Sequence, residues 1–206
     1  MNQKERMLAG LPYKSWMDGL LEENLENQKR TYEYNNCPPD DTDRLDRLIR
    51  GIVGKAGKNI NVRPPFHCDY GKNIEIGDNF FANFNTVILD VGKVTIGNNV
   101  MFAPNVSVYT AGHPIHPDSR NSGYEYGIPV TIGNNVWIGG NVVINPGVTI
   151  GNGCVIGSGS VVTKDIPDNS IAVGNPARVI RAITDSDRKF YFRDLEFDVD
   201  DYDHAK

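Results

Sequence analysis

Aliphatic residues recur at every sixth position over residues 132–162. The unbroken run consists of Ile132, Ile138, Ile144, Ile150, Ile156 and Val162. Glycine directly follows four of these residues. Because side chains on one face repeat about every 3.6 residues in a helix and about every 2 in a strand, neither a long helix nor a long strand explains this spacing. The pattern predicts short strands separated by tight turns, as in a β-helix whose hexapeptide repeats turn their aliphatic residues inward.

The same register extends towards the N-terminus with one shift and one interruption. The residues in phase are Ile96, Phe102 and Val108, and an earlier six-spaced set is Ile76, Ala82 and Ile88. The step from Ile88 to Ile96 is eight residues, which predicts an insertion near residues 90–92. Residues 111–127 carry no repeat and are polar and rich in Gly, Pro and aromatic side chains, so they predict a loop ejected from one coil. Loops on a rigid scaffold are where binding and catalytic residues concentrate.

The two ends of the chain differ from the repeats. Helical patterns cover residues 5–10, 19–34 and 43–53, with Thr42 as the predicted cap of the third helix. The predicted apolar stripe of the second helix is Leu20, Leu21, Leu25 and Tyr32. A helical segment can cover the open end of a solenoid, whose unpaired strand edges otherwise invite aggregation. We predict such a segment over 1–57, a β-helix domain over 58–183 with a loop at 110–128, and an acidic tail over 184–206.

Composition excludes several classes of protein. The net charge of −5, with no basic stripe, argues against general nucleic-acid binding. Cys37, Cys68 and Cys154 are odd in number and form no C-x-x-C pair, which favours reduced thiols. The N-terminus has no apolar signal core, and no run approaches the roughly 20 apolar residues of a membrane span. These features predict a soluble cytoplasmic protein without a nucleic-acid or membrane partner.

The predicted loop carries the histidine best placed for proton transfer. His113 lies at the root of the loop, and imidazole is the side chain best matched to proton transfer near neutral pH, so His113 is either a general base or a polar loop residue. His116 suggests a metal pair with His113, but no neighbouring His or Cys completes a zinc site, and no metal is predicted. We interpret His67 and His204 as structural or solvent-exposed. The chain has no G-x-S-x-G elbow and no G-x-x-x-x-G-K-[ST] loop, and Cys154 is predicted to be buried.

Cationic residues follow the last repeats. Lys164 comes directly after the hexads, and Arg178 and Arg181 stand three residues apart. Such side chains can clamp a phosphate group, and the planar guanidinium of arginine fits it best. A solvated charged face is the alternative.

Taken together, the chain resembles the maltose/galactoside O-acetyltransferases, which are hexapeptide-repeat acyltransferases with a left-handed β-helix. The resemblance covers residues 4–193. The matching segments are Glu5–Gly10, Tyr32–Asn35, Pro64–Phe66, Asn79–Asn85, Ile96–Val100, Ala103–Asn105, Gly112–Pro114, Ile132–Gly140, Val161–Asp165 and Gly174–Arg178. Many acyltransferases share the hexads. The helical N-terminal segment and Asn79–Asn85 make the resemblance to this family more specific.

The resemblance implies a mechanism and an assembly. It implies acetyl-CoA as co-substrate, no metal requirement, direct transfer to a sugar hydroxyl, and a homotrimer with active sites between subunits. His113 matches the catalytic base, Asn83 an acceptor-site residue, and Gly140 the position whose N–H faces the thioester carbonyl. The positions that match the coenzyme A channel and its nucleotide end are Trp137, Ser158, Thr163, Lys164, Arg178 and Arg181.

The expected acceptor site differs from the galactoside-specific pattern at several positions. Ser15 stands where an acidic sugar contact is expected. Asp90 is predicted to contact the acceptor, and Val91 follows it where a second acid can occur. Asp69 occupies the position of a small hydroxyl residue, and Glu125 that of an apolar one. These departures leave the acetyl-transfer residues intact but leave the acceptor sugar open.

Three other hypotheses about function compete with that of a sugar acetyltransferase. One is a related enzyme that acts on another acceptor, such as an antibiotic or an amino-acid hydroxyl, but the helical N-terminal segment favours the sugar class. Another is a non-catalytic hexapeptide scaffold, which the presence of both Asn83 and His113 disfavours. The last is a metalloenzyme resembling the γ-class carbonic anhydrases, which the scarcity of histidine disfavours.

Overall fold

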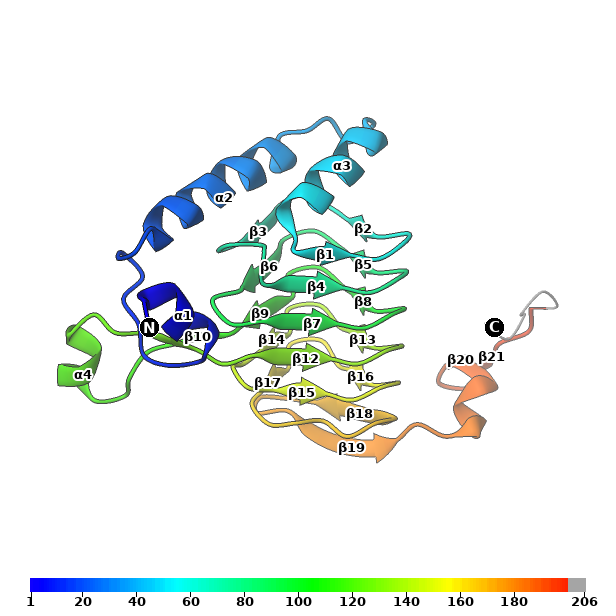
Figure 1. Cartoon of the computed structure of the whole chain (residues 1–206). Helices are drawn as coiled ribbons and strands as arrows, with labels where there is room; N and C mark the ends of the chain where they lie inside the picture. The colour runs from blue at the N-terminus through cyan, green and yellow to red at the C-terminus, as the bar shows by residue number, and fades with distance from the viewer. Residues whose placement is uncertain (200–206) are drawn as a thin grey trace.

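Short parallel strands stack into three sheets wound around one axis in the computed structural model, which describes residues 1–199 (Figure 1). The first sheet contains β1 (Lys55–Ala56), β4 (Ile74–Ile76), β7 (Val94–Ile96), β12 (Val130–Ile132) and β15 (Thr149–Ile150). The second contains β2 (Asn61–Val62), β5 (Phe81–Ala82), β8 (Met101–Phe102), β13 (Trp137–Ile138), β16 (Val155–Ile156), β18 (Ser170–Val173) and the antiparallel β19 (Arg178–Ala182). The third contains β3 (Phe66–Cys68), β6 (Thr86–Leu89), β9 (Ser107–Tyr109), β14 (Val143–Ile144) and β17 (Val161–Val162). Because the chain visits the three sheets in turn, the predicted parallel β-helix of hexapeptide repeats is confirmed.

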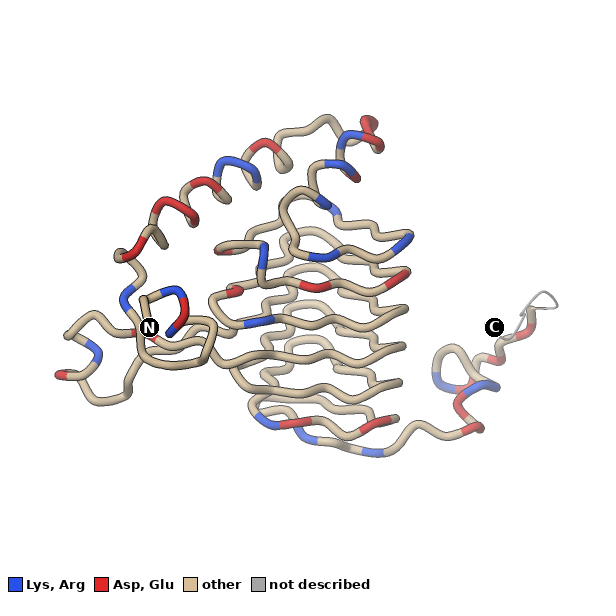
Figure 2. The backbone as a smooth tube through the Cα atoms, in the orientation of Figure 1, with Lys and Arg blue, Asp and Glu red and all other residues tan. Residues whose placement is uncertain are grey.

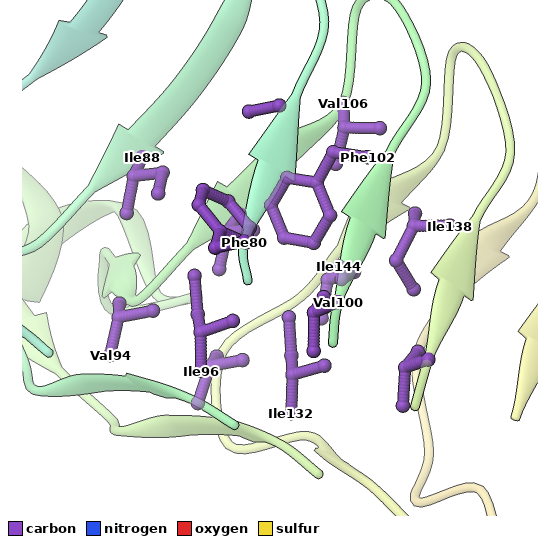
Figure 3. Packing of buried hydrophobic residues seen from close by; sticks show 14 of the residues in the cluster. Phe80, Ile88, Val94, Ile96, Val100, Phe102, Val106, Ile132, Ile138 and Ile144 are labelled. Atoms are coloured by element: carbon purple, nitrogen blue, oxygen red, sulfur yellow. The ribbon is translucent and has the colours of Figure 1, made fainter. Parts of the chain in front are cut away.

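Equivalent positions of successive coils lie directly above one another. Ile132 pairs with Ile96 on one side and with Ile150 on the other. The six-spaced residues predicted from the sequence are buried, with at most 2% of their surface exposed. Figure 3 shows Phe80 and Phe102 packed together in this interior, and their ring centroids lie 5.2 Å apart in an edge-on arrangement. The prediction that the hexads turn their aliphatic residues inward is therefore correct.

Asparagine residues form the corner between the first and second sheets. Asn79, Asn99 and Asn135 all have φ between +54° and +57°, a left-handed conformation that asparagine tolerates better than most residues. Nδ2 of Asn79 donates to Oδ1 of Asn99 at 2.9 Å, and Nδ2 of Asn99 donates to Oδ1 of Asn135 at 3.0 Å. This ladder links one coil to the next along the corner.

Three helices precede the coils: α1 (Gln3–Leu8), α2 (Leu20–Asn35) and α3 (Thr42–Ile52). Figure 1 shows α2 and α3 over the N-terminal end of the β-helix. The predicted cap of α3 was displaced by one residue. Asp41 is the cap, because its side chain accepts from the Arg44 N–H at 3.2 Å, and Thr42 is the first helical residue.

The predicted stripe of α2 is wrong for all but one of its members. Leu20 is buried, whereas the other three predicted members are exposed: Leu21, Leu25 and Tyr32. Asn27 and Tyr34 face inward instead. Nδ2 of Asn27 donates to the carbonyl of Cys68 on β3 at 3.2 Å, so α2 meets the sheet edge through polar contacts as well as apolar ones.

The chain leaves the last coil through a short tail. A 3-10 helix (Asp185–Arg188) precedes a hairpin of β20 (Phe190–Phe192) and β21 (Leu195–Glu196), which extends away from the coils in Figure 1. The end of the predicted acidic tail, including His204, lies outside the described residues.

Candidate active site

The predicted loop leaves the β-helix between β9 and β12, at the corner between the third and first sheets, called the histidine corner below. It contains an antiparallel pair, β10 (Ala111–Gly112) and β11 (Tyr126–Gly127), and the short helix α4 (Pro117–Asn121). A Cβ on Gly112 would lie 2.6 Å from ring atoms of Tyr126, so glycine lets the ring lie this close to β10. His113 follows β10 directly, and its position is therefore set by the pair.

His113 faces an acidic side chain from the other arm of the loop. Its Nε2 lies 3.9 Å from Oε2 of Glu125, and 58% of the His113 side chain is exposed. Glu125 is held by the N-terminal segment, because its N–H and C=O exchange hydrogen bonds of 3.0 and 2.9 Å with Tyr13. The helical segment thus supports the loop as well as covering the coils.

A cavity of about 510 Å³ opens beside this pair. Its lining residues are Ser15, Trp16, Leu21, Asn24, Asp69, Tyr70, Leu89, Val91, Ala111, His113 and Glu125. Four of the predicted site residues, His113, Ser15, Asp69 and Glu125, are therefore brought together by segments far apart in the chain. Sequence reasoning missed Trp16 and Asn24. The only signal for Trp16 was an aromatic residue in the polar stretch before the second helix.

Asp90 does not line the cavity, contrary to its predicted contact with the acceptor. Its side chain is fully buried, and its Oδ1 accepts from the N–H groups of Asp69 and Tyr70 at 3.0 and 2.9 Å. Asp90 belongs to the predicted insertion between β6 and β7, and its carboxyl turns inward to bind the preceding coil. It therefore positions the Asp69 turn.

Burial raises the pKa of Asp69 to about 6. The negative charge of Glu125 acts in the same direction, and a hydrogen bond from Asn24 acts against it. The carboxyl thus lies in surroundings that disfavour its charged form.

Asn83, Gly140 and Ser158 lie at a different corner, between the second and third sheets, called the Asn83 corner below. Oδ1 of Asn83 accepts from the Phe84 N–H at 2.8 Å. The Gly140 N–H, predicted to face a thioester carbonyl, donates to Oγ of Ser158 at 3.1 Å. Within one chain the third sheet separates this corner from His113, and none of the three residues lines the His113 cavity.

The remaining predicted residues lie on the C-terminal coils. Trp137 projects outward from β13 with 51% of its surface exposed, between Met101 and Val155 of the neighbouring strands. Thr163 and Lys164 follow β17 and are exposed at the histidine corner. The predicted arginines are exposed on β19, the last strand of the second sheet: Arg178 and Arg181.

One of these arginines already has a partner. Arg181 makes two hydrogen bonds, of 2.7 and 2.8 Å, with the carboxylate of Asp187 in the tail. This two-point contact lowers the pKa of Asp187 to about 2. Any phosphate that binds Arg181 must therefore compete with Asp187.

Residues 1–199 contain neither a candidate metal site nor a helix suited to span a membrane. No three His, Cys, Asp or Glu side chains gather there in a way that could hold a metal ion. None of the helices in that range is both long and apolar enough to cross a membrane.

Two family models match separate parts of the chain. The maltose acetyltransferase hexapeptide capping motif matches residues 6–57, and the bacterial transferase hexapeptide model of six repeats matches residues 129–164. Together with the β-helix and its histidine-bearing loop, these matches define a hexapeptide-repeat transferase with a helical cap.

Individual relatives show to which family of transferases the chain belongs. The galactoside O-acetyltransferase of Escherichia coli (strain K12) is 48% identical over 196 residues, which cover 95% of this chain and 97% of the relative. A galactoside acetyltransferase solved in complex with coenzyme A is 48% identical with a TM-score of 0.94, covering 97% of this chain and 100% of its own. The maltose O-acetyltransferase from Clostridium difficile 630 is 53% identical with a TM-score of 0.88, covering 89% and 98%. The chain belongs to the maltose/galactoside O-acetyltransferase family, and it is an acetyltransferase of that class.

Proposed function

We propose that this enzyme transfers the acetyl group of acetyl-CoA to a hydroxyl group of a sugar, with His113 as the general base. The observation that carries the proposal is the cavity of about 510 Å³ beside His113 and Glu125. This volume is within the range of small-molecule sites. A hydroxyl is a weak nucleophile at neutral pH, and a positioned base typically contributes ~10²–10⁴-fold in rate.

The proton of the acceptor hydroxyl moves in two steps, one as the new carbon–oxygen bond forms and one as the carbon–sulfur bond breaks. As the acceptor oxygen bonds to the carbonyl carbon, Nε2 of His113 takes the hydroxyl proton. When the carbon–sulfur bond breaks, the imidazolium gives that proton to the departing thiolate. Glu125, 3.9 Å from Nε2, stabilises the imidazolium between these two events.

The acetyl group passes directly to the acceptor without an acyl-enzyme. Cys37, Cys68 and Cys154 are all buried and none of them lines the cavity, and burial raises the pKa of the Cys68 and Cys154 thiols. A buried neutral thiol is a poor nucleophile. We infer that the Gly140 N–H stabilises the developing oxyanion once the Ser158 hydroxyl turns aside, and that Asn83 orients the acceptor.

Acetyl-CoA is the co-substrate that the C-terminal coils fit. Lys164, Arg178 and Arg181 are exposed there, and their charges suit the phosphate groups. Trp137, Ser158 and Thr163 would line the channel that the pantetheine arm follows. On binding, a phosphate group would replace Asp187 as the partner of Arg181.

We further propose a homotrimer with active sites between subunits. The outward residues of the second sheet form an apolar ladder: Phe81, Met101, Trp137, Val155 and Ile171. The first sheet instead presents Glu75, Thr95, Thr131 and Thr149. Figure 2 likewise shows few charged residues along the middle coils. Covering the apolar faces with further copies of the chain would bring the Asn83 corner of one subunit to the histidine corner of the next.

We place the enzyme in the cytoplasm, because its cysteines within the described residues are free thiols. Free thiols of this kind are typical of a reducing compartment.

An acceptor screen tests the proposal. Release of free thiol from acetyl-CoA is followed with maltose, glucose and a galactoside, and with serine and a hydroxylated antibiotic as non-sugar acceptors. We expect thiol release with the sugars and an O-acetyl ester by mass spectrometry. Turnover confined to the non-sugar acceptors, or absent with all of them, contradicts a sugar O-acetyltransferase.

A further inference from the structure

The cavity beside His113 contains carboxyl groups without a cationic side chain to balance them. Asp69 and Glu125 line it, and none of its lining residues within the described chain is lysine or arginine. Asp69 forms no ion pair among residues 1–199, and the one ion pair of Glu125 there is with His113. The nearby Lys14 forms no ion pair with either acid, and its Nζ lies 5.0 Å from the ring centroid of Tyr124 and 5.7 Å from that of Trp16.

Asp69 and Glu125 differ in the groups that face their carboxylates. Glu125 faces His113 and balances the imidazolium that forms during the reaction. Asp69, on the turn after β3, has no such partner, and burial together with the charge of Glu125 raises its pKa to about 6. A positive charge on a bound acceptor would favour the ionised form of Asp69 and offset the repulsion between the two acids.

An aromatic side chain forms another wall of the same cavity. Trp16 lines it with 53% of its surface exposed. The loop makes room for the indole at Gly123, where a Cβ would lie 2.2 Å from Cη2 of Trp16. The face of an indole packs against the apolar face of a sugar ring and also attracts cations. The cavity therefore combines a platform for a ring with the carboxyl group of Asp69, which forms no ion pair among the described residues.

We propose that the preferred acceptor is a sugar that carries a protonated amino group, which pairs with Asp69 while the ring packs against Trp16. This inference rests on the acetyl transfer proposed above. The protonated amine has no lone pair and is not acetylated. A neighbouring hydroxyl loses its proton to His113, its oxygen bonds to the acetyl carbon, and the carbon–sulfur bond of acetyl-CoA breaks to give the thiol.

Matched acceptors test the inference. We compare kcat/KM for methyl glucosaminide, methyl glucoside and methyl N-acetylglucosaminide, which differ in charge at one position, and repeat the set with the galactose series. In at least one series, one charge-assisted contact should favour the amino sugar by roughly tenfold over both neutral analogues. The product should be an ester, identified by mass spectrometry and by cleavage with hydroxylamine.

A charge-removing variant and its control assign the preference to Asp69. Asp69→Asn should bring the ratio of amino to neutral sugar close to one. Asp118→Asn removes a carboxylate from the same loop as His113 at a site that is 91% exposed and outside the cavity, and it should keep the wild-type ratio.

Several results overturn the inference. These are a wild-type ratio near or below one in both series, a ratio unchanged in Asp69→Asn, or an amide product. O-acetylation of the neutral sugars in those cases leaves the proposed function intact. Absence of O-acetylation with every sugar contradicts the proposed function itself, so the two failures are distinguishable.

Discussion

Single glycines and one backbone pairing determine where the side chains of the candidate site lie. Gly112 lets β10 approach the ring of Tyr126, and Gly127 lies so close to the neighbouring turn that a Cβ would be 2.8 Å from the Gly92 nitrogen. Tyr13 then binds the backbone of Glu125. Because these contacts fix both arms of the loop, His113 and Glu125 face each other before any acceptor binds.

The first prediction concerns His113. His113→Ala should lower kcat by ~10²–10⁴-fold, because the acceptor hydroxyl loses its base. The dissociation constant of acetyl-CoA, measured by calorimetry, should remain nearly unchanged because the predicted phosphate contacts lie elsewhere. Full activity in this variant, or an acetylated wild-type protein detected by mass spectrometry during turnover, contradicts the mechanism.

A second prediction separates charge from shape at Glu125. Glu125→Gln preserves the size of the side chain but removes the charge that faces the imidazolium, and kcat should fall by about tenfold or more. Glu22→Gln, an equal loss of charge on the exposed surface of α2, serves as the control and should retain wild-type kcat. Equal turnover in the two variants would show that Glu125 has no electrostatic role.

The raised pKa of Asp69 predicts how stability depends on pH. The carboxyl has an ordinary value of 3.8 and a folded value of about 6, so the folded state binds this proton more tightly. Its contribution to stability is present below the ordinary value and is lost as pH rises through about 6. The groups that face it are Glu125, Asn24 and Tyr70, with Asp90 behind the turn.

Asp69→Asn should therefore gain stability relative to wild type between pH 4 and pH 7.5. The expected change in the difference of unfolding free energies is on the order of 1–2 kcal/mol. Urea denaturation at both pH values measures it. A difference that is constant with pH, or that changes with the opposite sign, is inconsistent with the raised pKa.

At the scale of elements, the asparagine ladder explains how coils keep the same corner. Asn99 has φ +54° and bonds to Asn79 above and Asn135 below. Asn99→Gly loses the ladder but tolerates this backbone, whereas Asn99→Ala loses the ladder and adds left-handed strain. Thermal or urea unfolding should place the alanine variant about 1 kcal/mol below the glycine variant. The reverse order contradicts this explanation of the corner.

The repeats could be predicted from the sequence because each hexad obeys one local rule. Every sixth residue faces inward whatever its distant neighbours are, so the register of Ile132 and Ile144 needed no knowledge of the whole fold. The stripe of α2 failed because the contact between Asn27 and Cys68 is a long-range polar one, which helical periodicity does not reveal.

The candidate site was only partly predictable for the same reason. His113 could be singled out because it lies in the interruption of the repeats and matches a family motif. Glu125 lies in the same interruption and was singled out because it departs from the family pattern there. Trp16 reaches the cavity only through its packing on Gly123, 107 positions later in the numbering, and no local pattern reports that contact. Asp90 was misplaced because a carboxylate that binds backbone N–H groups looks the same in sequence as one that binds a ligand.

At the scale of the whole molecule, the residues of the proposed site are divided between two corners of one chain. The histidine corner contains the proposed base and the proposed acceptor cavity, whereas the Asn83 corner contains Asn83 and Gly140. The third sheet lies between them. In the proposed trimer, the apolar outward faces of the coils would provide the surface through which a neighbouring subunit supplies the other half.

Mixed oligomers test this central claim most directly. Asn83→Ala and His113→Ala chains with different affinity tags are co-expressed, and oligomers that contain both tags are purified. Each homogeneous variant should be nearly inactive. In a mixed trimer one site combines an intact His113 with an intact Asn83 of the neighbour, so activity should recover to about one third of wild type. Mixed oligomers no more active than the two variants alone would mean that both residues must come from the same chain, which contradicts the account.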